Sequence, residues 1–214
     1  MNTKKIISFS LWGNNPKYTI GALRNAELMP KIYPGWIARF YIGLSVPQDI
    51  IDNLKSFPNN EVIIMDESGD WNSMFWRFMT IDEDDVTINL SRDTDSRLSM
   101  REKLCVDEFI NSDKLFHNMI DHPWHAGIMG GMHGIKKGLV DNMSHLISQW
   151  SKTNQWQTDQ QFLNSIIAPI ASQSILLHDS IHLNNFPSER ENYHFVGEIF
   201  DQDDNRGEHY SVFF

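Results

Sequence analysis

Cysteine and positive charge are both scarce in this chain. Cys105 is the one cysteine among 214 residues, which excludes a disulfide framework within the chain and a cysteine-rich zinc site. Lys and Arg number 18 against 28 Asp and Glu, so the formal charge is 18 − 28 = −10. An acidic chain is a poor candidate for nucleic-acid binding through a broad basic face. An anionic ligand would therefore need local arginines or a metal ion.

The sequence also lacks a membrane span and a secretion signal. No run approaches the ~18 apolar residues that a spanning helix needs, and Ser8 and Ser10 interrupt the first apolar run too early for a signal peptide. We expect no membrane span, no nucleic-acid partner and a cytoplasmic location, which would be the host cytoplasm if the chain is viral. With 41% hydrophobic residues, we expect one domain over residues 1–214, which could be a module of a longer polypeptide.

Strand-like apolar runs alternate with helix-like segments along the chain. This alternation predicts an α/β fold with a largely parallel sheet, and such sheets bind ligands at the carboxyl ends of their strands. Two helix starts carry a capping-box pattern, Ser99 to Glu102 and Thr158 to Gln161. The strands are expected at residues 6–11, 37–42, 62–65, 86–90 and 174–177, and the helices at residues 20–33, 47–55, 71–81, 99–110 and from 158 to just before Pro169.

The clearest chemistry lies in Arg92-Asp-Thr-Asp-Ser-Arg97, directly after the strand expected at 86–90. Side chains two apart in an extended segment point the same way, so Asp93 and Asp95 present two carboxylates to one spot. Paired carboxylates repel unless a cation lies between them. Mg²⁺ or Mn²⁺ takes such oxygen ligands and shares its shell with substrate phosphates. We therefore expect a site for a divalent metal and an anionic ligand.

This segment is compatible with other interpretations. A surface turn of Asp–Arg ion pairs stays open, as does a non-catalytic module that binds nucleotide sugars or glycans. An EF-hand is excluded because Leu98 and Leu104 stand where that loop needs glycine and glutamate. A haloacid-dehalogenase-type phosphatase would use Asp93 as its nucleophile. That motif normally follows the first strand of its domain, whereas about 90 residues precede it here.

Further motifs follow this segment, and they are Asp121-His-Pro-Trp-His125, Met129-Gly-Gly-Met132, Asp159-Gln160 and His178-Asp179. Taken in order over roughly residues 5–200, the set resembles the GT-A-type glycosyltransferases of bacteria and of large algal DNA viruses, including the N-terminal domain of a chlorella-virus protein. The viral members are thought to glycosylate the capsid. The resemblance implies a GT-A-like, Rossmann-related fold with a mixed, mainly parallel central sheet flanked by helices.

The resemblance also assigns metal-binding and catalytic roles. Mn²⁺ or Mg²⁺ would be held by Asp93, Asp95 and His178, and His182 and His194 are other candidates for the third ligand. Asp159 is the first catalytic candidate and Asp121 the second. The acceptor side would carry His122, Trp124 and His125, where the indole could stack on a sugar.

The nucleotide-sugar donor would contact a further set of residues. This set comprises Ser8, Phe9, Ser10, Leu11, Arg77, Asp93, Thr94, Asp95, Arg97, Gly130, Gly131 and Gln160. Several of these residues also have a plainer explanation. Phe9 and Leu11 fit a core strand, Arg77 a surface side chain, and the glycines a bend. Asp159 likewise fits an acidic residue at a helix start.

The function expected from these residues is transfer of a hexose from a UDP-sugar to a glycan or glycoprotein acceptor, dependent on Mn²⁺ or Mg²⁺. Glucose is the favoured sugar and rhamnose the next. The phosphatase that would use Asp93 and the non-catalytic binding module are the alternatives.

Overall fold

The structure is a computed structural model that describes residues 3–151 and 153–213. Its centre is a seven-stranded sheet in the order β3-β2-β1-β4-β6-β5-β7. Only β6 runs against its neighbours β4 and β5, and the other paired strands are parallel. The expected mixed, mainly parallel α/β sheet is confirmed. The strands are β1 Lys4–Leu11, β2 Ile37–Ile42, β3 Asn60–Ile64, β4 Val86–Ser91, β5 Phe116–Ile120, β6 His133–Lys136 and β7 Ile175–Asp179.

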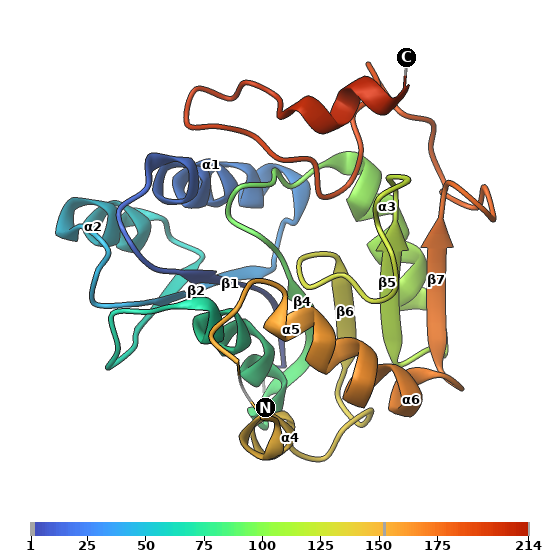
Figure 1. The fold of residues 1–214 in the computed structure, drawn as a ribbon, viewed down its shortest axis with the longest axis horizontal. Coiled ribbons are helices and arrows are strands. Elements are labelled where there is room, and N and C mark those ends of the chain that lie inside the picture. The colour runs from blue at the N-terminus through green and yellow to red at the C-terminus, as the bar shows by residue number, and fades with distance from the viewer. Residues whose placement is uncertain (1–2, 152, 214) are drawn as a thin grey trace.

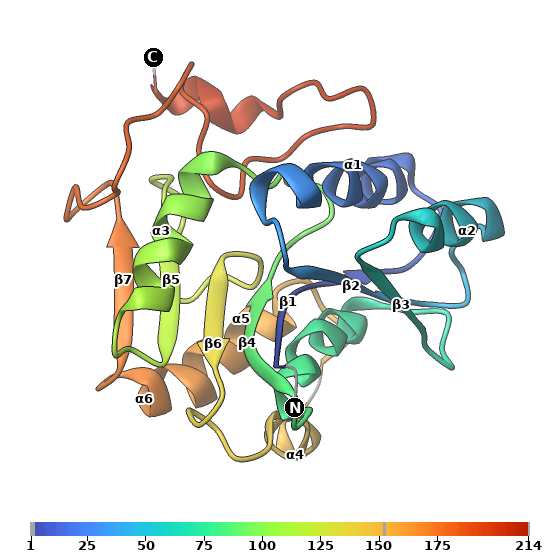
Figure 2. The same cartoon turned by 180° about the vertical axis from the view of Figure 1, so that it is seen from behind.

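Helices cover both faces of the sheet (Figures 1 and 2). One apolar core lies between the sheet and α1, α2 and α3. A second core lies on the other face, under η1, α4 and the segment from α5 to α6. The helices are α1 Pro16–Ile32, α2 Gln48–Ser56, the 3₁₀ helix η1 Trp71–Asp82, α3 Met100–Asn111, α4 Met143–Gln149, α5 Thr158–Phe162, the π-helical η2 Leu163–Ile167, α6 Ala168–Ala171 and the 3₁₀ helix η3 Glu208–Phe213.

The starts of α1 and α3 follow local capping chemistry, whereas the start of α5 does not. The Asn15 side chain accepts the Lys17 N–H at 3.0 Å, so α1 begins four residues before the expected start. Ser99 caps α3 as expected, accepting the Glu102 N–H at 3.3 Å. The capping box expected at Thr158 is wrong. Gln157 takes the N-cap position of α5 with a left-handed φ of 68°.

The sheet contains two strands that the sequence analysis missed. Both β5 and β6 carry buried polar side chains where a strand pattern would show apolar ones, namely His117, Asn118 and His133. Because β6 is antiparallel, its first residues lie at the edge where β4 and β5 end. The glycine-rich turn before β6 therefore reaches the carboxyl end of β4.

The segment after β7 returns across the carboxyl ends of the strands (Figure 1). It is drawn in orange to red, from the end of β7 to η3. The Phe200 N–H donates to the Asp95 carbonyl oxygen at 2.8 Å. This chain segment therefore contacts the loop that follows β4 and forms one wall of the region above it.

Candidate functional site

A cavity of about 740 Å³ opens at the carboxyl ends of the central strands. Its volume lies within the range of small-molecule sites, roughly 300–1,000 Å³. It is lined from six parts of the chain: Ser10 to Asn15 with Tyr18; Trp71, Met74 and Arg77; Asp93 to Asp95; His122, Trp124, His125 and Met129 to Met132; Trp156, Gln157, Asp159 and Gln160; and Phe195, Gly197, Ile199 and His209.

Asp93 and Asp95 both lie on the wall of this cavity, just after β4. The Asp95 side chain is only 14% exposed, and its Oδ2 pairs with Lys17 Nζ at 2.8 Å. Burial, and next the negative charge of Asp93, raise the pKa of Asp95 above its usual value. The two carboxylates therefore repel each other, and Lys17 compensates only one of them.

Arg77 connects the Asp93 loop to α5 from a buried position. Its Nη1 donates to the Arg92 carbonyl oxygen at 2.9 Å and pairs with Asp93 Oδ1. Its Nη2 pairs with Asp159 Oδ2 at 3.0 Å. Protein carboxylates use both terminal nitrogens, and Arg77 also lines the cavity, so its direct contact with the donor stays a prediction. Arg77 positions Asp93 and Asp159.

Asp159 is nine-tenths hidden from solvent or more, yet it lines the cavity with Gln160. Burial raises the pKa of Asp159, although the neighbouring Arg77 charge opposes the shift. A carboxylate of raised pKa accepts a proton more readily near neutral pH. The geometry is therefore compatible with the expected catalytic role.

The glycines of the turn before β6 pack directly on these carboxylates. A Cβ added at Gly131 would lie 2.5 Å from Asp93 Cγ, and one added at Gly130 would lie 2.5 Å from Asp159 Oδ2 and 2.9 Å from Arg77 Nη2. Real Cβ atoms essentially never show contacts this short, so an added Cβ would force the ion-paired side chains to shift. The turn needs glycine because the ion-paired side chains occupy the adjacent space.

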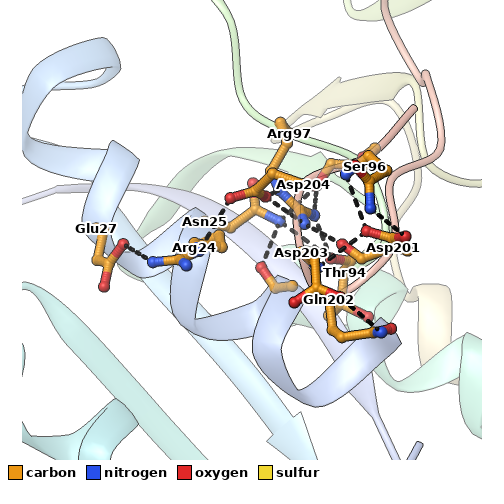
Figure 3. Close-up of polar contacts among 12 residues, drawn as sticks. Arg24, Asn25, Glu27, Thr94, Ser96, Arg97, Asp201, Gln202, Asp203 and Asp204 are labelled. Atoms are coloured by element: carbon orange, nitrogen blue, oxygen red, sulfur yellow. Dashed lines mark hydrogen bonds and ion pairs between the residues drawn. The ribbon is translucent and has the colours of Figure 1, made fainter. Parts of the chain in front are cut away.

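The loop that carries Asp95 is held by side chains of α1 and by the C-terminal segment, as Figure 3 shows. Asn25 Nδ2 donates to the carbonyl oxygens of Thr94 and Ser96 at 3.3 and 2.9 Å. Arg97 pairs with Asp204 at 2.9 Å and donates to the Asp201 carbonyl oxygen at 3.1 Å. Arg97 thus binds the C-terminal segment and does not line the cavity, which corrects its expected contact with the donor.

The first strand, β1, which carries four of the residues expected to contact the donor, reaches the cavity only at its end. Ser10 and Leu11 line it, whereas Ser8 and Phe9 are fully buried elsewhere. Ser8 Oγ lies 2.7 Å from the Arg77 carbonyl oxygen, and the Phe9 ring stacks on Phe40 at 4.8 Å. The expected donor contacts of Ser8 and Phe9 are therefore corrected: both hold the strand in place.

His178 does not join the two aspartates. It is buried on β7, where Nδ1 lies 2.8 Å from His117 Nε2 and Nε2 lies 2.9 Å from Glu108 Oε2. The other two histidine candidates also have carboxylate neighbours, His182 at Asp179 and His194 at Glu198. Among the described residues, no group of three or more His, Cys, Asp or Glu could hold a metal ion. The expected three-residue ligand set is therefore wrong.

Asp121 also lies outside the cavity lining. Its carboxylate is fully buried and accepts hydrogen bonds from Arg101 at 2.7 and 2.8 Å, Ser180 Oγ at 2.6 Å and the Val196 N–H at 2.8 Å. Arg190 adds an ion pair at 2.9 Å. A carboxylate that is saturated in this way has no access to a substrate. Its expected catalytic role gives way to a structural one, holding the C-terminal segment to β5.

The three residues expected on the acceptor side do line the cavity. They are joined by Phe195 and His209 from the C-terminal segment, which the sequence analysis did not assign to the site. The neighbouring His194, a candidate for the third metal ligand, was the nearest residue that the sequence pointed to. Trp71 and Trp156 also line the cavity and were not predicted. A tryptophan is usually expected in the core, but Trp71 is 41% exposed and Trp156 is 69% exposed.

No protein-family model matches this sequence, and no curated protein matches it either. Several solved structures share its fold. A glycosyltransferase involved in the glycosylation of the major capsid of PBCV-1 has a TM-score of 0.54 at 16% identity, over 84% of this chain and 83% of that chain. The 4-diphosphocytidyl-2C-methyl-D-erythritol synthase of Anaerococcus prevotii has a TM-score of 0.53 at 9% identity, over 90% and 95%.

A third solved structure is the CMP:2-keto-3-deoxy-manno-octonic acid synthetase complexed with CTP, with a TM-score of 0.50 at 10% identity, over 83% of this chain and 90% of that chain. At identities this low the likeness establishes the fold, and the expected GT-A-like fold is confirmed. No helix within residues 3–151 and 153–213 is long and apolar enough to cross a membrane.

Proposed function

We propose that this chain is a metal-dependent glycosyltransferase that takes a UDP-hexose donor, with glucose the favoured sugar and rhamnose the next. The observation that carries the proposal is the charge of the cavity. One arginine and three aspartates line it, so its formal charge is 1 − 3 = −2 with histidines neutral. A diphosphate would be repelled there unless a cation accompanies it. The paired carboxylates of Asp93 and Asp95 are the natural ligands for that cation.

Mg²⁺ and Mn²⁺ fit these residues. Such ions are often held by one or two carboxylates, and the substrate phosphates and water complete the shell. Two aspartates are therefore sufficient without a histidine. The bound ion would neutralise the diphosphate and stabilise the charge on departing UDP. Lys17, next to Asp95, is the cation that would have to give up its contact or move to the phosphates.

The protein side chains then divide the remaining work. Arg77 holds Asp93 toward the cavity and Asp159 toward the reacting sugar. Asp159 is the catalytic candidate, as a buried carboxylate of raised pKa that lines the cavity. The cavity ends of β1 and η1 supply aromatic surface for the nucleobase, through Trp12 and Trp71, whose rings pack edge-on at 6.2 Å.

Glycosyl transfer is favoured over nucleotidyl transfer by the same charge count. A nucleotidyltransferase must hold a nucleoside triphosphate and a sugar phosphate together, and both carry several negative charges. Arg77 is the one Lys or Arg among the described residues that line the cavity, and its terminal nitrogens are already paired. A UDP-sugar with a neutral acceptor asks for much less positive charge.

Calorimetric titration of UDP, GDP and CDP tests this proposal, each with Mn²⁺ and with chelator. We expect UDP to bind with Mn²⁺ and chelator to abolish binding. Asp95→Asn should weaken binding at least tenfold, because it removes one of two charged ligands. Asp113→Asn is the matched control, since that side chain is 89% exposed and remote from the cavity. Equal binding with chelator, or no binding of any nucleotide, would contradict the proposal.

A further inference from the structure

Five aromatic rings gather at one end of the cavity, and we call this group the aromatic recess: His122, Trp124, His125, Phe195 and His209. All five line the cavity. His122 lies at the centre, with ring centroids 4.6 Å from Phe195, 5.1 Å from Trp124 and 5.4 Å from His125. The recess is formed by the loop after β5 and the segment after β7. The two are connected by a hydrogen bond of 3.0 Å between His122 Nε2 and the His209 carbonyl oxygen.

Trp124 offers a large apolar surface in this recess. Its side chain is 64% exposed, although its ring packs nearly edge-on against His122 and His209, at 76° and 80°. Two perpendicular neighbours fix the indole plane, so little side-chain entropy remains to be lost on binding. A rigid, open indole is a stacking surface for a flat ligand with C–H groups.

The recess is built without carboxylate, ammonium or guanidinium side chains. The four charged side chains that line the cavity are Arg77, Asp93, Asp95 and Asp159, and none belongs to the recess. Burial lowers the pKa of His122 and lowers the pKa of His125 to about 4, so both imidazoles are neutral at pH 7. A charged ligand group would lose its water here without gaining a partner, which is costly.

The hydrogen bonds of His125 leave one donor for a ligand. Its Nδ1 accepts the Asp121 N–H at 3.4 Å, so the proton of the neutral ring is on Nε2. No partner of that Nε2–H occurs among the described residues. His122 differs, because its Nδ1 accepts the Trp124 N–H at 3.1 Å and its Nε2–H donates to the His209 carbonyl oxygen.

We propose that the aromatic recess binds a neutral pyranose ring, the accepting sugar of the acceptor glycan, which stacks on Trp124 while one hydroxyl accepts the His125 Nε2–H. This inference rests on the proposed function, because the bound sugar is an acceptor only if the chain transfers a glycosyl group. It names the substrate class, which is an uncharged sugar rather than a uronic acid or a sugar phosphate. It also makes the C-terminal segment part of the site, through Phe195 and His209.

Saturation-transfer NMR on the full chain tests this inference with methyl glycosides of glucose, galactose and rhamnose as neutral probes. Methyl glucuronoside is the charged counterpart. Trp124→Ala should reduce binding of the neutral probes at least tenfold, and His125→Phe about three- to tenfold, because it keeps the ring and loses one neutral hydrogen bond. Trp156→Ala is the matched control, since Trp156 lines the same cavity outside the recess. Both tryptophans are largely exposed, so neither variant threatens the fold.

Saturation of neutral glycosides, with a weak or absent glucuronoside signal and with loss in Trp124→Ala but not in Trp156→Ala, supports the inference. Absence of any glycoside signal overturns it, as does equal binding of the glucuronoside or an equal loss in both tryptophan variants. UDP titration of the same samples separates this from the proposed function. UDP binding without glycoside binding refutes the recess alone, and glycoside binding without nucleotide binding refutes the donor site.

Discussion

Arg77 is the residue whose removal should reveal most about how the site is held. Its guanidinium is 1% exposed, and it pairs with Asp159, which is 4% exposed. Removing one partner of a buried ion pair costs about 3–5 kcal/mol, because the other charge stays buried without compensation. We therefore expect Arg77→Met to lower the free energy of unfolding by about that amount at pH 8. Lys103→Met removes the ion pair with Asp107 on α3, and it should lower the free energy of unfolding by only about 0.5 kcal/mol.

The loss in Arg77→Met should depend on pH with a defined sign. Burial already raises the pKa of Asp159, and loss of the Arg77 charge would raise it further. A carboxyl whose folded pKa exceeds its unfolded value, about 3.9, binds more protons when folded. Its stabilising protonation is complete below the unfolded pKa and is lost as pH rises through the folded pKa. Each unit of additional shift adds about 1.4 kcal/mol of destabilisation above that window.

Urea unfolding followed by tryptophan fluorescence at pH 5 and pH 8 measures both quantities. Arg77→Met should be less destabilised at pH 5 than at pH 8, and Asp159→Asn in the same background should restore part of the loss at pH 8. An Arg77→Met variant that loses less than about 1 kcal/mol would refute this reasoning, as would a loss that is the same at both pH values. Additivity of the two substitutions within about 0.5 kcal/mol would also show that the pair is not coupled.

Three further predictions concern a glycine beside Asp93, the buried His178 and the buried cysteine. Gly131→Ala should displace the Asp93 carboxylate and weaken Mn²⁺-dependent UDP binding at least tenfold in calorimetry, whereas Asp113→Asn, at an exposed side chain remote from the cavity, should not; equal affinities would contradict the close packing. His178→Gln should leave that binding within about threefold of the parent chain, because His178 is bound to His117 and Glu108; a tenfold loss would restore it as a metal ligand. Cys105 is buried and burial raises the pKa of its thiol, so iodoacetamide at pH 8 should label it only after unfolding, as mass spectrometry would show.

Most of the sheet could be predicted because its strands carry plain apolar runs. β2 begins and ends at the expected residues, and β1 and β4 differ by two residues or fewer at each end. β5 and β6 were missed because His117 and His133 are polar residues whose burial depends on distant partners. His117 is hydrogen-bonded to His178, and the His133 ring packs against Phe78 with ring centroids 5.2 Å apart. A pattern of single residues carries no information about such partners.

The site was predictable where motif and strand end coincide. The Asp93 and Asp95 pair follows a strand, and strand ends define the ligand edge of a parallel sheet. Asp121 and His178 also follow or end strands, yet their side chains turn to arginines and to histidine and glutamate in the interior. Whether a polar side chain at a strand end points into the cavity or into the protein interior depends on residues far away in the sequence. The aromatic recess needed the fold as well, because its two halves lie 70 or more positions apart in the sequence, as His125 and Phe195 do.

The most direct test of glycosyl transfer is to identify the phosphorus-containing products that form from the substrates of a glycosyltransferase and from those of a nucleotidyltransferase. Phosphorus-31 NMR would follow UDP-glucose with Mn²⁺ in one tube, and UTP with glucose 1-phosphate and Mn²⁺ in another. We predict slow formation of UDP in the first tube, faster with a neutral glycoside acceptor and absent in Asp95→Asn, and no pyrophosphate in the second. Pyrophosphate and UDP-glucose in the second tube, with UDP-glucose unchanged in the first, would contradict the central claim and identify a nucleotidyltransferase.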